Sequence, residues 1–136
     1  MTQEIINQYQ IKLQNLMEQY GIKFLNKIFD WDGNKEIVKS LKVNNKYLNE
    51  FLDNWNADEI EELLLPDINQ ALLNPNAEIE NGSETINILI YQNKVDFYTL
   101  DEGFVYTVPT SDFKQIVEGW RDFLQTPPLN GPYVVN

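Results

Sequence analysis

Hydrophobic residues at the start of the chain repeat with the period of an α-helix. Over residues 3–20 the apolar and aromatic positions are three or four residues apart along one face, namely Ile6, Tyr9, Leu13, Leu16, Met17 and Tyr20. Thr2 is a candidate N-cap for this stripe. Gly21 follows it and tolerates the left-handed backbone that often ends a helix. The spacing predicts one amphipathic helix over residues 3–20.

The middle of the chain carries helical stripes broken by turns. Residues 22–31 are apolar with polar interruptions and fit a short helix or a strand, and residues 30–34 (Asp-Trp-Asp-Gly-Asn) form a turn. From residue 34 to residue 74 the pattern predicts helices. A short apolar stripe at residues 37, 38 and 41 comes first, followed by a helix over 47–55 with Asn44 or Asn45 as its N-cap. A third helix over 59–65 has Asn56 or Asp58 as its N-cap, and a fourth over 66–73 begins at Pro66.

After Asn81-Gly82 the pattern changes to that of strands. Residues 85–91, 95–100 and 104–108 are rich in β-branched and aromatic side chains and are joined by short turns. Thr110 then predicts an N-cap for an amphipathic helix that ends by Thr126, since two prolines follow. We therefore predict a single α+β domain over residues 1–136, with a helical N-terminal half, a three-stranded antiparallel meander and a closing C-terminal helix packed on the sheet.

The composition removes several classes of chemistry. The 136 residues contain neither cysteine nor histidine. Disulfides, thiolate zinc sites and the Ser/His/Asp and Cys/His catalytic arrangements are therefore excluded. Asp30 and Asp32 beside Gly33 resemble part of a calcium loop, but Ile28 and Lys39 occupy its first and last ligand positions. We expect no metal site, no cofactor and no catalytic residue.

Charge is distributed unevenly along the chain. The net charge is −11, yet residues 1–46 hold seven lysines and five acidic residues (+2), and residues 47–136 hold three basic and 16 acidic residues (−13). Such a field repels nucleic acid and anionic membranes and attracts a basic protein. The first ten residues are polar and carry no secretory pattern, and no apolar run is long enough to cross a bilayer. We expect a cytoplasmic protein whose partner is another protein.

Two acidic groups are the candidate contact residues. The first is the helix start formed by Asp58, Glu59, Glu61 and Glu62, where Asp58, Glu61 and Glu62 share a face. Negative charge also suits a helix N-terminus electrostatically, without any partner. The second group is the predicted hairpin tip, Asp101 and Glu102, with Tyr98 on the preceding strand. An aromatic side chain beside carboxylates suits a basic partner surface.

Residues 94–124 combine a meander, the run Val108-Pro109-Thr110-Ser111-Asp112-Phe113, and a helix closing on Trp120, Phe123 and Leu124. This arrangement resembles small bacterial immunity proteins, which neutralise polymorphic or contact-dependent toxins. The resemblance implies binding to a cognate toxin, basic and possibly a nuclease, with occlusion of its active site. It covers about a quarter of the chain and transfers no binding residue.

Two other functions fit the same residues. A non-toxin adaptor or regulatory binding module, including a phage-encoded inhibitor, predicts a similar acidic surface with a different partner. A hydrolase that uses carboxylates predicts two converging acids in a concave site. The sequence leaves the oligomeric state open.

Overall fold

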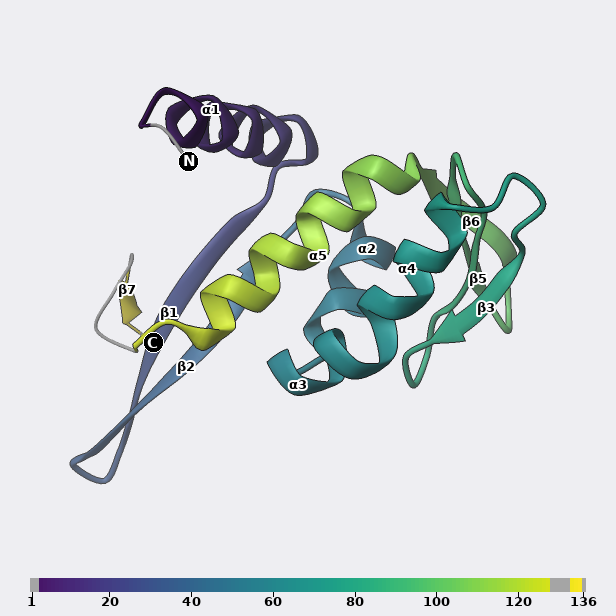
Figure 1. Ribbon diagram of the computed structural model, residues 1–136. Helices are drawn as coiled ribbons and strands as arrows, with labels where there is room; N and C mark the ends of the chain where they lie inside the picture. Colours follow the sequence, from purple (N-terminus) through teal and green to yellow (C-terminus); the bar gives the residue numbers. More distant parts are fainter. Residues whose placement is uncertain (1–2, 128–132, 136) are drawn as a thin grey trace.

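The computed structural model describes residues 3–127 and 133–135 and confirms the α+β class (Figure 1). In chain order the elements are α1 (Gln3–Tyr20), β1 (Lys23–Trp31), β2 (Asn34–Lys42), α2 (Lys46–Asp53), α3 (Ala57–Glu59), the π-helical turn η1 (Ile60–Leu64), α4 (Leu65–Leu72), β3 (Ile79–Gly82), β4 (Asn87–Ile90), β5 (Val95–Thr99), β6 (Gly103–Val108), α5 (Thr110–Gln125) and β7 (Tyr133–Val135). Within the described residues, no helix combines the length and apolar character that a bilayer span requires.

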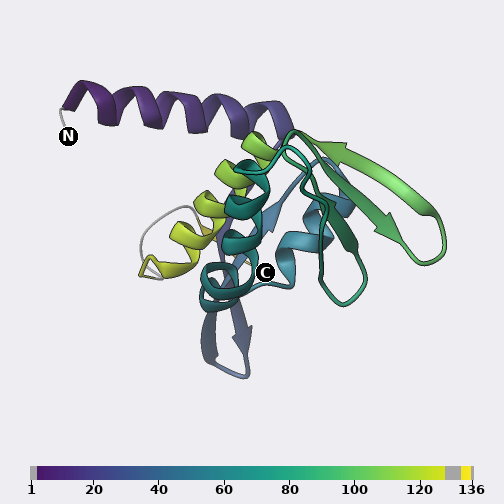
Figure 2. The same ribbon diagram turned by 45° about the vertical axis from the view of Figure 1, so that its right-hand side comes forward.

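The predicted first helix is confirmed as α1. Gly21 ends it with a φ of +62°, and the amide of Ile22 donates to the carbonyl of Met17 at 2.8 Å, as in a Schellman C-terminal cap. Thr2, the expected N-cap, lies outside the described residues. Figure 2 shows that much of α1 projects away from the body of the molecule.

Residues 23–42 form a long hairpin, which we call the arm. β1 and β2 pair in unbroken antiparallel register from Lys23–Lys42 to Trp31–Asn34. Asp32 and Gly33 connect them with φ values of 50° and 84°, as a tight hairpin turn requires. The helical prediction for residues 34–41 is therefore wrong. Their short apolar stripe is compatible with a strand as well as a helix, and the tight turn at residues 32–33 brings them into pairing with β1. In Figure 1 the arm extends to the lower left.

The helical stretch after the arm is close to the prediction. Asn45 caps α2, because its side-chain oxygen accepts from the amides of Tyr47 and Leu48 at 3.0 and 3.1 Å. The predicted third and fourth helices join without a break, since α3, η1 and α4 run consecutively. Pro66 lies in the first turn of α4, as expected.

The predicted meander is confirmed as β4, β5 and β6, and the sheet has a further strand. Its order is β3-β4-β5-β6, with every pair antiparallel. The pattern did not predict β3, because Ile79–Gly82 holds one apolar residue and a glycine. A second sheet has the order β2-β1-β7, with β7 parallel to β1.

Helix α5 joins these parts through the apolar stripe that the sequence predicts. Phe113, Ile116, Val117 and Trp120 are all buried. Thr110 does not cap the helix, because it is already its first residue and its hydroxyl donates to the carbonyl of Tyr91 at 2.7 Å. The Trp120 ring lies 5.4 Å from that of Phe24 on β1, and its Nε1 donates to the carbonyl of Leu52 on α2 at 3.0 Å.

The centre of the core is aromatic. The Phe51 ring of α2 lies 5.8 Å from that of Phe97 on β5 and 5.9 Å from that of Phe113 on α5. All three side chains are fully buried. Because Phe51 contacts the sheet and α5 together, it holds three elements in place.

Removing Phe51 is expected to cost more stability than any surface truncation. Phe51→Ala should lower the free energy of unfolding by about 3–5 kcal/mol, since it removes a buried ring and leaves a cavity. Leu100→Ala is the control: Leu100 is 98% exposed, and its truncation should change stability by less than about 0.5 kcal/mol. Urea unfolding followed by circular dichroism measures both, and equal losses would contradict this packing.

Helix α1 is tied to α5 by one pH-dependent bond. The Tyr20 hydroxyl donates to the Asp112 carboxylate at 2.7 Å, and burial together with this bond raises the pKa of Tyr20. The folded state therefore keeps the phenol proton at a pH where the unfolded chain loses it. This stabilisation is complete below about pH 10 and falls as the pH rises further. Urea titrations between pH 8 and pH 11 should show a shallower loss for Tyr20→Phe than for the native chain; identical slopes would count against it.

Candidate functional site

A hollow lies between α2 and the tip of the β5–β6 hairpin, and we call it the acidic groove. Its volume is about 470 Å³. Three segments line it: α2 (Lys46, Tyr47, Glu50), the β3–β4 connection with its approach to β4 (Glu84, Thr85, Ile86), and the hairpin tip (Thr99, Leu100, Asp101, Glu102). The fold thus places four carboxylates and one lysine around a shallow depression.

The hairpin tip is held in place by two hydrogen bonds. The Tyr47 hydroxyl donates to Glu102 Oε2 at 2.9 Å, which connects the tip to α2. The Glu102 amide donates to Thr99 Oγ1 at 3.0 Å, and Gly103 leaves the tip with a φ of +74°. Asp101 and Leu100 are left exposed beside these fixed groups.

A second hollow continues the groove toward α3. It measures about 260 Å³ and is lined by Asn54, Trp55, Glu59, Leu63, Gly82, Ser83 and Glu84. Glu84 lines both hollows, so the two adjoin. Trp55 is 8% exposed here, and its Nε1–H has no acceptor among the described residues. A buried donor without a partner costs about 1–3 kcal/mol.

Five carboxylates along the two hollows form what we call the acidic surface: Glu50, Glu59, Glu84, Asp101 and Glu102. All five residues are exposed. Within the described part of the chain, none of them takes part in a salt bridge. Lys46 is the one basic residue that lines either hollow. The surface therefore carries a strong local excess of negative charge.

Glu59 has a local structural role as well as a place on this surface. The Glu59 amide donates to the Asn56 side chain at 2.8 Å, and the Asn56 amide donates back to Glu59 Oε1 at 3.2 Å. This capping box confirms Asn56 as the N-cap and fixes the direction in which α3 begins. Asp58 in the same turn is exposed.

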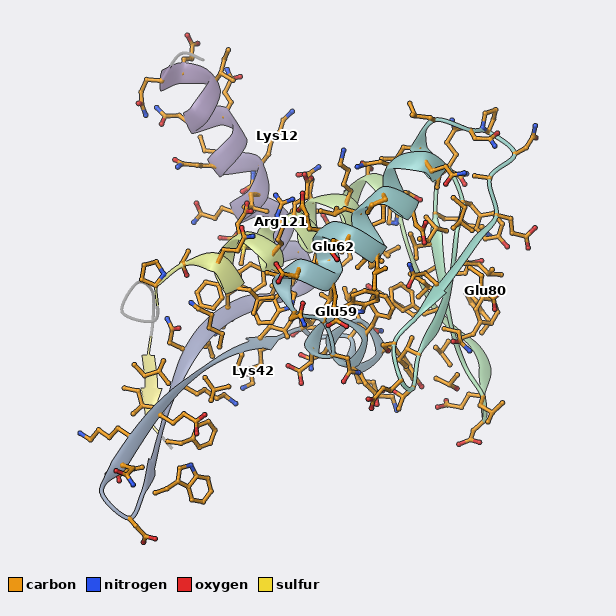
Figure 3. The ribbon with its side chains drawn as sticks, turned by 60° about the horizontal axis from the view of Figure 1, so that its bottom comes forward. Lys12, Lys42, Glu59, Glu62, Glu80 and Arg121 are labelled. Atoms are coloured by element: carbon orange, nitrogen blue, oxygen red, sulfur yellow. The ribbon has the colours of Figure 1, made fainter. Side chains whose placement is uncertain are left out.

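Glu61 is directed to a different neighbour. Its Oε2 lies 2.7 Å from Nη1 of Arg121 on α5, and Arg121 also contacts Asp122 at 3.0 Å. The charge of Glu61 is thus compensated by a basic residue of the same chain. Glu62 is exposed, and Figure 3 shows it near Arg121 and above Glu59. The structure therefore divides the predicted acidic cluster between the groove side, with Glu59, and the α5 side, with Glu61.

Tyr98 does not line the acidic groove. It is half-buried, and its ring lies 5.9 Å from that of Phe104 in an edge-on contact. It lines a separate hollow together with Glu80, Asn87, Ile88 and Leu89. Tyr98 therefore does not share a single concave site with Asp101 and Glu102, although the sequence grouped the three residues.

The sequence did not indicate three of the residues that line the groove, namely Tyr47, Glu50 and Glu84. Glu50 and Tyr47 belong to a helix that the pattern predicts, and their groove role depends on which neighbour α2 packs against. Glu84 lies in a connection next to the unpredicted strand β3. The only sequence signal was regional: nearly all the acidic excess lies after residue 46.

The structure gives no support for metal or acid–base chemistry at the remaining acids. Within the described residues, no three acidic side chains are grouped as metal ligands would be. Asp30 accepts from the Gly33 amide at 3.2 Å, as a turn aspartate does. Asp96 is buried, but Lys94 at 3.2 Å and the Thr107 hydroxyl at 2.7 Å already satisfy its carboxylate.

Loss of the capping box should destabilise the start of α3, which carries Glu59 of the acidic surface. Asn56→Ala is expected to lower the free energy of unfolding by about 1 kcal/mol, because the Glu59 amide at the start of α3 loses its side-chain acceptor. Glu59→Gln keeps an oxygen acceptor and should cost clearly less. Chemical denaturation of both variants makes the comparison, and a larger loss for Glu59→Gln would contradict the assignment.

Comparison of the chain with protein-family models, with curated proteins and with solved structures gave no match. The resemblance of residues 94–124 to bacterial immunity proteins therefore stays a prediction. The geometry and charge of the acidic surface are the observations from which a function can be inferred.

Proposed function

We propose that this protein is an immunity protein: it binds a cognate basic toxin and neutralises it by occluding the toxin's active site. The observation that carries the proposal is the acidic surface, where four separate segments of the chain place exposed carboxylates around adjoining hollows, none of them in a salt bridge within the described residues. Scattered acidic residues that serve solubility alone have no reason to converge in this way.

The chemistry of such a surface suits the cleft of a nuclease. Clefts that bind nucleic acid present lysine and arginine to phosphates, and carboxylates at similar spacing replace those phosphates. The surface charge also speeds the encounter of oppositely charged proteins. This protein would therefore bind a basic toxin quickly and cover the toxin's catalytic groups.

Apolar contacts supplement the charges. Leu100 is 98% exposed at the hairpin tip, and Leu63 is exposed on η1 beside Glu59. Side chains of this kind, surrounded by charge, form the centre of many protein interfaces.

The exposure of these acids favours contact over catalysis. A carboxylate that acts as a general acid needs a dry environment to raise its pKa. The five acidic residues of the surface are instead open to solvent. No specific observation favours a hydrolase.

Charge reversal on the acidic surface should abolish protection. With the toxin encoded by the neighbouring gene, Glu84→Lys/Asp101→Lys is expected to raise Kd by about 10- to 100-fold at 0.1 M salt, because each substitution places repulsion against a basic cleft. Titration calorimetry gives Kd, and survival of cells expressing the toxin gives protection.

The matched control is Glu4→Lys/Glu18→Lys, which makes the same charge change at exposed positions on α1. It should bind and protect as the native chain does. Equal loss in both double variants would point to net charge rather than this surface. No binding by the native chain, together with no protection of cells, would remove the proposal.

A further inference from the structure

The arm has one face against the body and one face that no other element of the described residues covers. Cross-strand partners share a face, and the pairs alternate along the hairpin. Phe24 and Lys39 mark the inner face: the Phe24 ring stacks 5.5 Å from that of Phe123, and Lys39 Nζ donates to Thr126 at 2.9 Å on the C-terminal side of α5. The outer face consists of the alternate pairs 23–42, 25–40, 27–38, 29–36 and 31–34.

The outer face combines exposed apolar groups with lysines. Trp31 is 64% exposed, Val38 is 39% exposed, and the Trp31 ring stacks on Phe29 at 6.2 Å with an angle of 13° between the planes. Lys23, Lys27 and Lys42 share this face with a single acid, Glu36. A preorganised aromatic side chain surrounded by positive charge is typical of an interface anchor.

The acidic surface, together with the adjoining β5–β6 hairpin, also combines exposed apolar side chains with charged ones, but its charges are negative. Leu100 and Leu63 lie on it, and Phe104 is 56% exposed at the start of β6 next to the tip. Asp101 and Glu102 line the same hollow as Leu100, and Glu59 lines the same hollow as Leu63. Figure 1 shows the arm at one end of the molecule and the four-stranded sheet at the other.

We propose that two copies of this chain associate as a reciprocal dimer, in which the outer face of each arm packs on the acidic surface of the other copy. A two-fold axis makes both contacts at once, because each copy offers both complementary surfaces. A nine-residue strand spans about 30 Å, which gives the arm the reach to cross to a neighbour.

Charge argues against the other ways of pairing two arms. Packing two outer faces on one another would gather six lysines at one contact. Pairing β2 edge to edge would bring Lys35, Lys39 and Lys42 of both copies together, and lysines on an edge strand oppose such pairing. The acidic surface is the partner that the lysines of the arm favour.

Ionic strength should affect this dimer in two directions. Each copy carries a net charge of −11, so distant charges repel the copies at low salt. At 0.1 M salt the screening length is about 10 Å, which suppresses that repulsion and leaves close ion pairs effective. At about 1 M salt the ion pairs are screened as well, and only the apolar contacts of Trp31 and Val38 remain. Association should be strongest at intermediate salt.

This inference concerns the chain in the absence of a toxin: both contacts use the acidic surface, so toxin binding and dimerisation would compete. It is tested by sedimentation equilibrium of the full chain between about 1 and 500 μM at 0.1 M salt. The native chain should dimerise. Lys23→Glu/Lys27→Glu on the arm and Glu84→Lys/Asp101→Lys on the acidic surface should each weaken the dimer by about 10-fold or more. Trp31→Ala should also weaken it, and Lys12→Glu/Lys114→Glu is the charge-matched control that should not.

Mixing the two double variants is the decisive measurement. In the mixed dimer one contact joins the reversed arm to the reversed surface, and the other contact is native, so the affinity should return to near the native value. A native chain that stays monomeric throughout the range overturns the proposal. So does a dimer that responds to the arm variant but not to the surface variant, or a mixture that shows no recovery.

Discussion

The packing of α5 on its neighbours is the constraint on which the rest of the structure depends. Phe113 contacts Phe51 and Phe97 and so joins the helix to α2 and to the four-stranded sheet, and two turns later Trp120 contacts Phe24 of the arm. One buried stripe therefore holds both sheets. Without it the chain would have two small sheets, neither of which would bury enough apolar surface to be stable alone.

This arrangement also determines where charge accumulates. The arm leaves one end of α5 and carries five lysines of the N-terminal third, namely Lys23, Lys27, Lys35, Lys39 and Lys42. The acidic surface forms where α2, α3 and the hairpin tip converge on Glu84. A charge difference along the sequence thus becomes a charge separation in space, and both proposed interactions of this protein rest on that separation.

Part of the acidic surface was visible from the sequence. Asp101 and Glu102 were predicted as exposed tip residues, because a meander with short turns leaves its tips in solvent. Glu61 shows the limit of this reasoning: its helical spacing grouped it with Asp58 and Glu62, but Arg121, 60 residues later, compensates its charge. Glu50 and Glu84 could not be assigned, since their proximity depends on how α2 packs against the sheet.

The sequence by itself determined the α+β class, α1, the meander, α5 and the regional imbalance of charge, because these depend on periodicity, turn residues and composition within short windows. Only the tertiary structure decided that residues 34–42 are a strand, that β3 joins the sheet, and that Trp31 is exposed. Each of these is settled by a partner outside the segment itself or by packing against the rest of the fold. A short apolar stripe satisfies a helix and a hairpin equally, and contact with the rest of the fold selects between them.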